Sequence, residues 1–167
     1  MRLTLHADYA LRTLMFLGLR PDRLSSVPEI AAAYRISENH LTKVVHRLGR
    51  AGFIETLRGR GGGIRLARAP QEIGLGEVVR CTEDDLALLV CFGPDGKPRG
   101  NGLEDGGCMI AGACRLRSAL AEALGAFMGV LDRMTLADLV APPLAETTAA
   151  RLGLPQPEPA PAHAGPA

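Results

Sequence analysis

The sequence predicts a mainly α-helical fold with a small β-hairpin: a winged helix-turn-helix followed by a long C-terminal helix. Two short apolar-faced segments, residues 26–34 and 37–50, are separated by a tight turn. A glycine-rich strand-turn-strand pattern follows at residues 53–66, and an apolar stripe with nearly heptad spacing runs from Leu116 to Met134. With 167 residues, of which 47% are hydrophobic, the chain can bury one core of ordinary size.

The first helix is expected at residues 8–19, where apolar residues recur at helical spacing. Asp8 stands in its first turn, where the helix dipole favours an acidic side chain. Asp8 and Arg12 also interrupt the apolar stretch that a signal peptide needs, and no run approaches the roughly eighteen apolar residues of a membrane-spanning helix. We therefore expect a cytoplasmic protein with no membrane partner.

Residues 26–50 have the pattern of a helix-turn-helix. Ser26 and Ser37 are positioned to cap two successive helices, and Gly52 follows the second one. The outward side chains of the second helix are rich in hydrogen-bond donors: Asn39, His40, Lys43, His46, Arg47 and Arg50. Such a face is typical either of a helix that reads DNA or of the solvent side of a core helix. If the helix reads DNA, the donors up to Lys43 are placed for base edges in the major groove, and Arg47 and Arg50 for phosphates.

The glycine-rich segment after this helix favours the DNA-reading interpretation. Residues 53–57 and 64–66 read as strands, and the turn between them holds glycines that accept positive φ: Gly59, Gly61, Gly62 and Gly63. A nucleotide-binding phosphate loop is disfavoured, because that motif ends in Gly-Lys-Ser/Thr and opens a helix. The predicted wing carries three arginines that suit a minor groove: Arg58, Arg60 and Arg65.

The charge is divided unevenly along the chain. Residues 1–80 hold thirteen Lys and Arg against seven Asp and Glu, whereas residues 81–167 hold six against eleven. The net charges of the two parts are therefore +6 and −5. A basic first part suits a polyanion such as double-stranded DNA. We assign residues 1–80 to a winged helix-turn-helix DNA-binding domain.

Residues 81–114 form a segment in which three cysteines stand in a glycine-rich, charged stretch: Cys91, Cys108 and Cys114. In the cytoplasm such cysteines are more often thiols or metal ligands than disulfides. Zinc is disfavoured because these cysteines lack the close pair that structural zinc sites use. Three thiolates suit an iron–sulfur cluster, which normally takes four protein ligands. Cys81 is a candidate for the fourth, although its apolar neighbours favour a buried structural role.

Residues 115–140 are predicted to form a dimerisation helix and its end. A helix of about twenty residues whose apolar stripe is unmatched elsewhere most simply pairs with a second copy of itself. Packing against its own domain is the alternative. Residues 141–167 hold seven prolines and eight alanines, a composition typical of a disordered tail.

Four sequence blocks stand out together: "MRLTLHADYALRTLMFL", "VPEIAAAYRISENHLTKVVHRLGRAGFIETLRGRGGGIRLA", "IGLGEVVR" and "TLADLV". They resemble the Rrf2 family of winged-helix repressors, and within it the members that sense nitric oxide. The resemblance spans residues 1 to about 140 and implies a homodimer that binds palindromic DNA. It further implies a cluster held by Cys91, Cys108 and Cys114 of one subunit and by Asp8 of the partner subunit. A hard carboxylate leaves one iron more exchangeable, which suits a sensor of a small diatomic molecule.

Two departures from the family pattern matter. Sixteen residues separate Cys91 from Cys108, where a much shorter spacing is usual. A glycine-rich loop can return on itself at a logarithmic entropic cost, so the distance in sequence does not prevent ligation. Arg117 stands where the iron–sulfur biogenesis regulator of the family has a histidine, which disfavours the histidine-ligated subtype.

The sequence therefore predicts a dimeric transcriptional repressor, not an enzyme, whose operator binding is controlled by an iron–sulfur cluster that reacts with nitric oxide. A 4Fe–4S cluster is favoured over 2Fe–2S. The alternatives within this class are a sensor of iron or redox state, and a regulator without a cluster that senses through its thiols. An alternative of another class is a small iron–sulfur electron-transfer protein, which would not need the winged-helix half.

Overall fold

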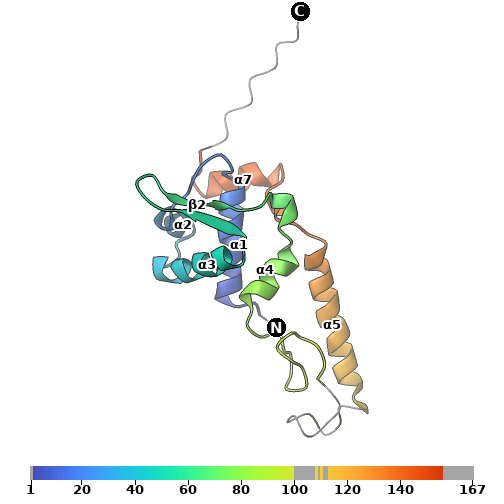
Figure 1. Ribbon diagram of the computed structural model, residues 1–167. Helices are drawn as coiled ribbons and strands as arrows, with labels where there is room; N and C mark the ends of the chain where they lie inside the picture. The colour runs from blue at the N-terminus through green and yellow to red at the C-terminus, as the bar shows by residue number, and fades with distance from the viewer. Residues whose placement is uncertain (1, 100–107, 109, 111–112, 156–167) are drawn as a thin grey trace, which may run out of the picture.

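The structure of the protein is a computed structural model that describes residues 2–99, 108, 110 and 113–155 (Figure 1). Its elements are, in order, α1 (Leu5–Gly18), α2 (Val27–Tyr34), α3 (Glu38–Arg50), β1 (Ile54–Leu57), β2 (Gly63–Leu66), the short 3-10 helix η1 (Pro70–Glu72), α4 (Leu75–Thr82), α5 (Arg115–Asp132), α6 (Leu136–Leu139) and α7 (Leu144–Arg151). The described chain is mainly helical with one two-stranded antiparallel hairpin, which confirms the predicted fold class. None of its helices combines the length and the apolar character needed to cross a bilayer.

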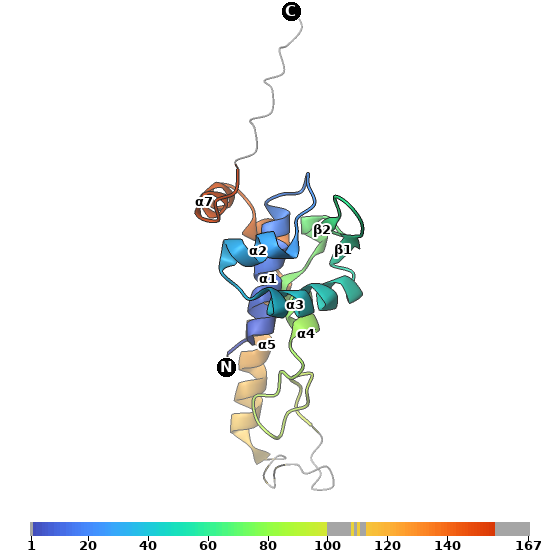
Figure 2. The same cartoon turned by 90° about the vertical axis from the view of Figure 1, so that its left-hand side faces the viewer.

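Helix α1 is the centre of the winged domain and packs against α2, α3, α4 and α6 (Figures 1 and 2). It begins at Leu5, earlier than predicted, because the Thr4 hydroxyl caps it by accepting a hydrogen bond from the Ala7 amide. Phe16 of α1 and Leu48 of α3 are fully buried in the same core. Burial of a large apolar side chain contributes about 1.5–3 kcal/mol, so this core holds α3 firmly against α1.

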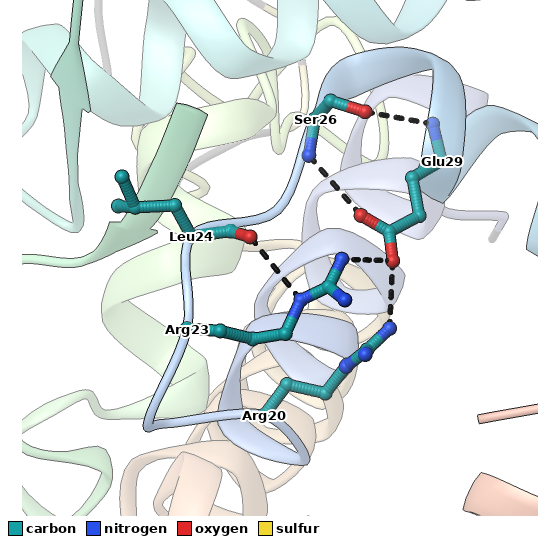
Figure 3. Close-up of polar contacts among 5 residues, drawn as sticks. All are labelled: Arg20, Arg23, Leu24, Ser26 and Glu29. Atoms are coloured by element: carbon teal, nitrogen blue, oxygen red, sulfur yellow. Dashed lines mark hydrogen bonds and ion pairs between the residues drawn. The ribbon is translucent and has the colours of Figure 1, made fainter. Parts of the chain in front are cut away.

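The turn between α1 and α2 is fastened by the carboxylate of Glu29 (Figure 3). Ser26 and Glu29 form a capping box at the start of α2, with the Glu29 amide donating to the Ser26 hydroxyl at 3.3 Å. The Glu29 carboxylate also accepts hydrogen bonds from the guanidinium groups of Arg20 and Arg23. At the other end of α2, Arg35 adopts a left-handed conformation with φ of 55° and turns the chain towards α3. Both ends of α2 are therefore fixed.

The wing is a short hairpin anchored to the chain before α2. In its register Thr56 of β1 lies opposite Ile64 of β2. Ile64 also forms an antiparallel bridge with Ser25. The turn requires glycine at position 62, because a Cβ atom there would lie 2.3 Å from the carbonyl oxygen of Leu57. The wing is thus held at β2 by the bridge to Ser25, and β1 packs against α3.

Helix α4 connects the winged domain to the long helix α5 and packs against both α1 and α5. Arg80 of α4 forms a bidentate ion pair with Asp132 of α5, in which its two Nη atoms donate to the two carboxylate oxygens at 2.6 and 2.7 Å. Leu124 and Met128 of α5 are buried, but the N-terminal part of α5 projects away from the winged domain (Figure 1). Leu116 on that part is 60% exposed. Contacts within one chain bury only part of the apolar stripe of α5. The role of that stripe in dimerisation stays a prediction.

The prediction of disorder from residue 141 onward is wrong for its first part. Helix α7 occupies residues 144–151, and Ala149 and Leu154 join the main core with exposures of only 6% and 8%. The prolines of this region lie before and after residues 144–154, and the alanines between them favour a helix. Residues 156–167, the rest of the predicted tail, lie outside the described residues.

Candidate nucleic-acid interface and cysteine segment

Helix α3 presents the polar face that its sequence predicts. Asn39, His40 and Lys43 are exposed, whereas Leu41 and Val44 on the opposite face are buried. The buried face is held by the core, so the exposed donors of the first two turns project from a fixed support. This arrangement is typical of a helix that enters a major groove.

Two of the three predicted wing arginines lie at the tip. Arg58 and Arg60 are exposed in the turn between β1 and β2. Arg65 lies within β2 instead, directly opposite Glu55, and forms an ion pair with it. Because Glu55 neutralises part of the charge of Arg65, Arg58 and Arg60 are better placed to meet a polyanion.

Basic side chains also surround a groove beside α3. The groove has a volume of about 570 Å³ and lies where α3 faces the start of α1 and the end of α4. Its polar lining consists of His6, Lys43, His46, Arg47, Arg50 and Cys81. A second groove of about 610 Å³ lies between α3 and β1 and includes Arg58. Concave basic surfaces concentrate positive potential, so α3 and the wing together form a surface suited to a polyanion.

Arg47 differs from the other cations of α3, because its side chain is engaged within the protein. Its Nε donates to the carbonyl oxygen of Cys81 at 2.6 Å, and its Nη2 donates to the Asp84 carboxylate at 2.7 Å. The hydrogen bond with Asp84 raises the pKa of Arg47, and the same bond lowers the pKa of Asp84. The sequence predicted a phosphate contact for Arg47, but the structure gives it contacts to the end of α4.

The cysteines are all free thiols. Cys91 is buried, Cys108 and Cys114 are half-buried, and Cys114 is the residue immediately before α5. The described residues contain no group of three or more His, Cys, Asp or Glu side chains placed to hold a metal ion. The structure of one chain therefore does not bring the three predicted ligands together, and their joint ligation stays a prediction. Half-buried Cys81 packs against the main core, as the alternative for that residue anticipated.

The long insertion after Cys91 begins as a closed hairpin that we call the Cys91 hairpin, residues 91–99. The Arg99 amide donates to the Cys91 carbonyl oxygen at 2.9 Å, and Phe92 pairs with Pro98. Phe92 is only 1% exposed. The guanidinium of Arg117, in the first turn of α5, donates to the carbonyl oxygen of Arg99. The hairpin thus ends against the helix that Cys114 precedes. Sequence reasoning missed this hairpin, although Pro-Asp-Gly is a known turn signal.

Asp8, the predicted ligand across the dimer, lies in the first turn of α1. Its carboxylate forms an ion pair with Arg12, one turn later, at 2.8 Å. The Asp8 side chain is 39% exposed, so its carboxylate is accessible from outside the chain. In chemical type, three free thiols and one accessible carboxylate fit an iron–sulfur cluster.

Comparison with known proteins gives one family. Residues 3–142 match the sequence profile of Rrf2, described as an iron-dependent transcriptional regulator. The HTH-type transcriptional regulator NsrR of Shouchella clausii is 51% identical over 141 residues, which cover 84% of this chain and 89% of that protein. The protein of the same name from Bacillus subtilis is 49% identical over 141 residues, with coverages of 84% and 90%.

Solved structures show the same fold at lower identity. CymR, the global cysteine regulator of B. subtilis, superposes with a TM-score of 0.63 and 23% identity over 83% of this chain and 95% of its own. IscR of T. potens gives a TM-score of 0.64 and 22% identity, with coverages of 90% and 90%.

Proposed function

Because the chain belongs to the Rrf2 family of transcriptional regulators, we propose that it is a repressor whose operator binding is controlled by an iron–sulfur cluster that reacts with nitric oxide. As a regulator of this family it is not an enzyme. We further propose that it acts in the cytoplasm as a homodimer on a palindromic operator. One turn of DNA between half-sites would match the two-fold symmetry of such a dimer.

The observation that carries the proposal is the placing of two of the thiols. Cys91 begins the Cys91 hairpin, and Arg99 at the other end of that segment donates to the Cys91 carbonyl oxygen. The Arg99 carbonyl oxygen in turn accepts from Arg117 in the first turn of α5, the helix that Cys114 precedes. The motifs that relate the chain to nitric-oxide-sensing members of the family include the stretch around Asp8, and that resemblance implies both cysteines as ligands. This combination supports ligation by Cys91, Cys108 and Cys114 together with Asp8 of the partner subunit.

The cluster would supply iron at which nitric oxide can bind, and we propose that it is of the 4Fe–4S form. The protein's own part is mechanical. Asp8 sits on α1, and α1 packs against α3, so a change in what holds Asp8 reaches the recognition surface through the core. Freed from the cluster, Asp8 retains Arg12 as its partner. A few kcal/mol of lost preorganisation in α3 would lower operator affinity by a hundredfold or more.

The test is an anaerobic titration. The purified full chain is expected to be brown and to contain iron and sulfide, and to bind a palindromic duplex selected from random DNA. Stepwise addition of nitric oxide should bleach the cluster absorbance and release the duplex in parallel, as followed by fluorescence anisotropy. A colourless, zinc-loaded preparation that binds the duplex fully would refute control by a cluster.

A second candidate is an iron-sensing regulator that uses the same ligands. The description of the family as iron-dependent favours it. An iron chelator added without nitric oxide separates the two signals. Prompt release of DNA on chelation, with little effect of nitric oxide, would favour iron sensing.

A further inference from the structure

Two successive acidic residues tie the exit of α4 to the winged domain. Glu83 accepts hydrogen bonds from the backbone amide and the hydroxyl of Thr4, at 2.7 and 3.0 Å. Asp84 accepts from the guanidinium of Arg47, which also donates to the Cys81 carbonyl oxygen. We call these contacts the α4 clasp. A shift of the chain that leaves α4 would therefore break or move its hydrogen bonds to Thr4, before α1, and to Arg47 on α3.

Arg47 is suited to this role by its shape. A planar guanidinium can donate in two directions at once, which a lysine ammonium on a flexible stem does less well. The Cys81 carbonyl lies in the last turn of α4, where backbone oxygens lack helical partners and the helix dipole attracts a cation. The side chain of Arg47 is 33% exposed, against 87% for Asp84, so the arginine is the inner partner of the pair.

The clasp continues directly into the cysteine segment. Cys91 follows Asp84 by seven residues. Between them, the Leu86 amide donates to the Pro94 carbonyl oxygen of the Cys91 hairpin at 2.9 Å. A path therefore runs from the hairpin that holds Cys91 by a hydrogen bond to Leu86, along the backbone to Asp84, and by a hydrogen bond to Arg47 on α3.

We propose that Arg47 is a positioning residue that transmits the state of the cysteine segment to α3, rather than a contact to a DNA phosphate. This inference rests on the proposed function, because it names the route by which the cluster would control DNA binding within one chain. Breaking the clasp should make DNA affinity less dependent on whether the cluster is present, without abolishing DNA binding. The exposed donors of α3, Asn39, His40 and Lys43, do not take part in it.

The experiment compares Asp84→Asn and Arg47→Lys with the wild type. Glu77→Gln is the matched control, because it removes a carboxylate on α4 that pairs with an arginine outside the clasp, Arg68, at 3.1 Å. For each protein the dissociation constant of the selected duplex is measured anaerobically, with the cluster loaded and after its removal by a chelator. The ratio of the two constants is the coupling factor.

We expect the coupling factor to fall by about fivefold or more in both clasp variants and to stay unchanged in Glu77→Gln. A factor within about twofold of the wild type in either clasp variant would overturn the proposal. A wild-type factor near one would instead contradict the proposed function. If a variant cannot be loaded with the cluster, the proposal is tested by the hydrogen-exchange rates of the α3 amides in cluster-free protein. Exchange faster than in Glu77→Gln supports the clasp, and equal exchange refutes it.

Discussion

The amide of Arg99 donates a hydrogen bond to the carbonyl oxygen of Cys91, so the chain returns to the cysteine after eight residues. Of the sixteen residues between Cys91 and Cys108, only residues 100–107 remain to be spanned from Arg99. Halving the number of residues between two joined points lowers the entropic cost of closure by about 0.6 kcal/mol. The hairpin also holds Cys91 in place, which would lower the cost of bringing two thiols to the proposed cluster.

Gly96→Ala is expected to weaken cluster retention. Gly96 has φ of +74°, and a Cβ atom there would lie 2.6 Å from a methyl carbon of Leu124. The backbone strain alone costs about 1–2 kcal/mol, so the hairpin should loosen and the cluster should be lost several times faster to a chelator. The rate is read from visible absorbance. Gly59→Ala is the control, because φ there is +105° but nothing lies within 4 Å. Equal rates in the two variants would contradict a role for the hairpin.

Cys108→Ala is expected to abolish the cluster, whereas Cys81→Ala should retain it. Cys81 packs against the core of the winged domain, and a small apolar side chain can take its place. Iron and sulfide analysis of anaerobically purified protein gives the answer. Loss of the cluster in Cys81→Ala with retention in Cys108→Ala would overturn the choice of ligands.

The elements that sequence predicts best are those whose signals are local. The period of Leu41, Val44 and Leu48 identifies the buried face of α3, and the glycines after Leu57 identify the wing turn. The seven prolines of residues 141–167 predict a disordered tail, but none of them lies within residues 144–154, where α7 forms.

Contacts between distant residues leave no such signal. Arg47 and Asp84 are 37 positions apart, and the helical pattern gives Arg47 the same outward direction as Lys43. Only the position of the end of α4, within reach of Arg47, engages one of these cations inside the protein. Likewise Arg65 reads as a wing cation until the strand register places Glu55 opposite it. The proposed ligand set includes Asp8 of the partner subunit, whose position no pattern within one chain can predict.

Glu29→Ala should destabilise the winged domain by about 2 kcal/mol. Glu29 closes the capping box of α2, and it balances Arg20, whose side chain is only 9% exposed. Urea unfolding measures the change. Glu55→Ala removes an exposed partner of a single arginine and should cost less than about 1 kcal/mol. Equal losses would mean that Glu29 does not fasten the turn.

Arg60→Ala should weaken binding of the selected duplex about three- to tenfold and reduce the salt dependence by about one counterion. Arg60 is exposed at the wing tip and has no ion-pair partner among the described residues. Cluster content should not change. Arg65→Ala is expected to have a smaller effect, because Glu55 already offsets that charge. Unchanged affinity in Arg60→Ala would remove the wing from the DNA-contacting surface.

His6→Gln should flatten the pH dependence of stability between about pH 7 and pH 5. Burial lowers the pKa of His6 below its ordinary value of 6.5, and the charge of Arg47 adds to this effect. The unfolded chain therefore binds more protons than the folded one in this range, so the free energy of unfolding of the wild type falls as the pH falls below 6.5. The lowered pKa values of Asp84 and Asp132 act only at more acidic pH, where these carboxylates become protonated. Urea unfolding of cluster-free protein at several pH values gives the slope of unfolding free energy against pH for the wild type and for His6→Gln. If His6→Gln keeps the wild-type slope, another group is responsible for it.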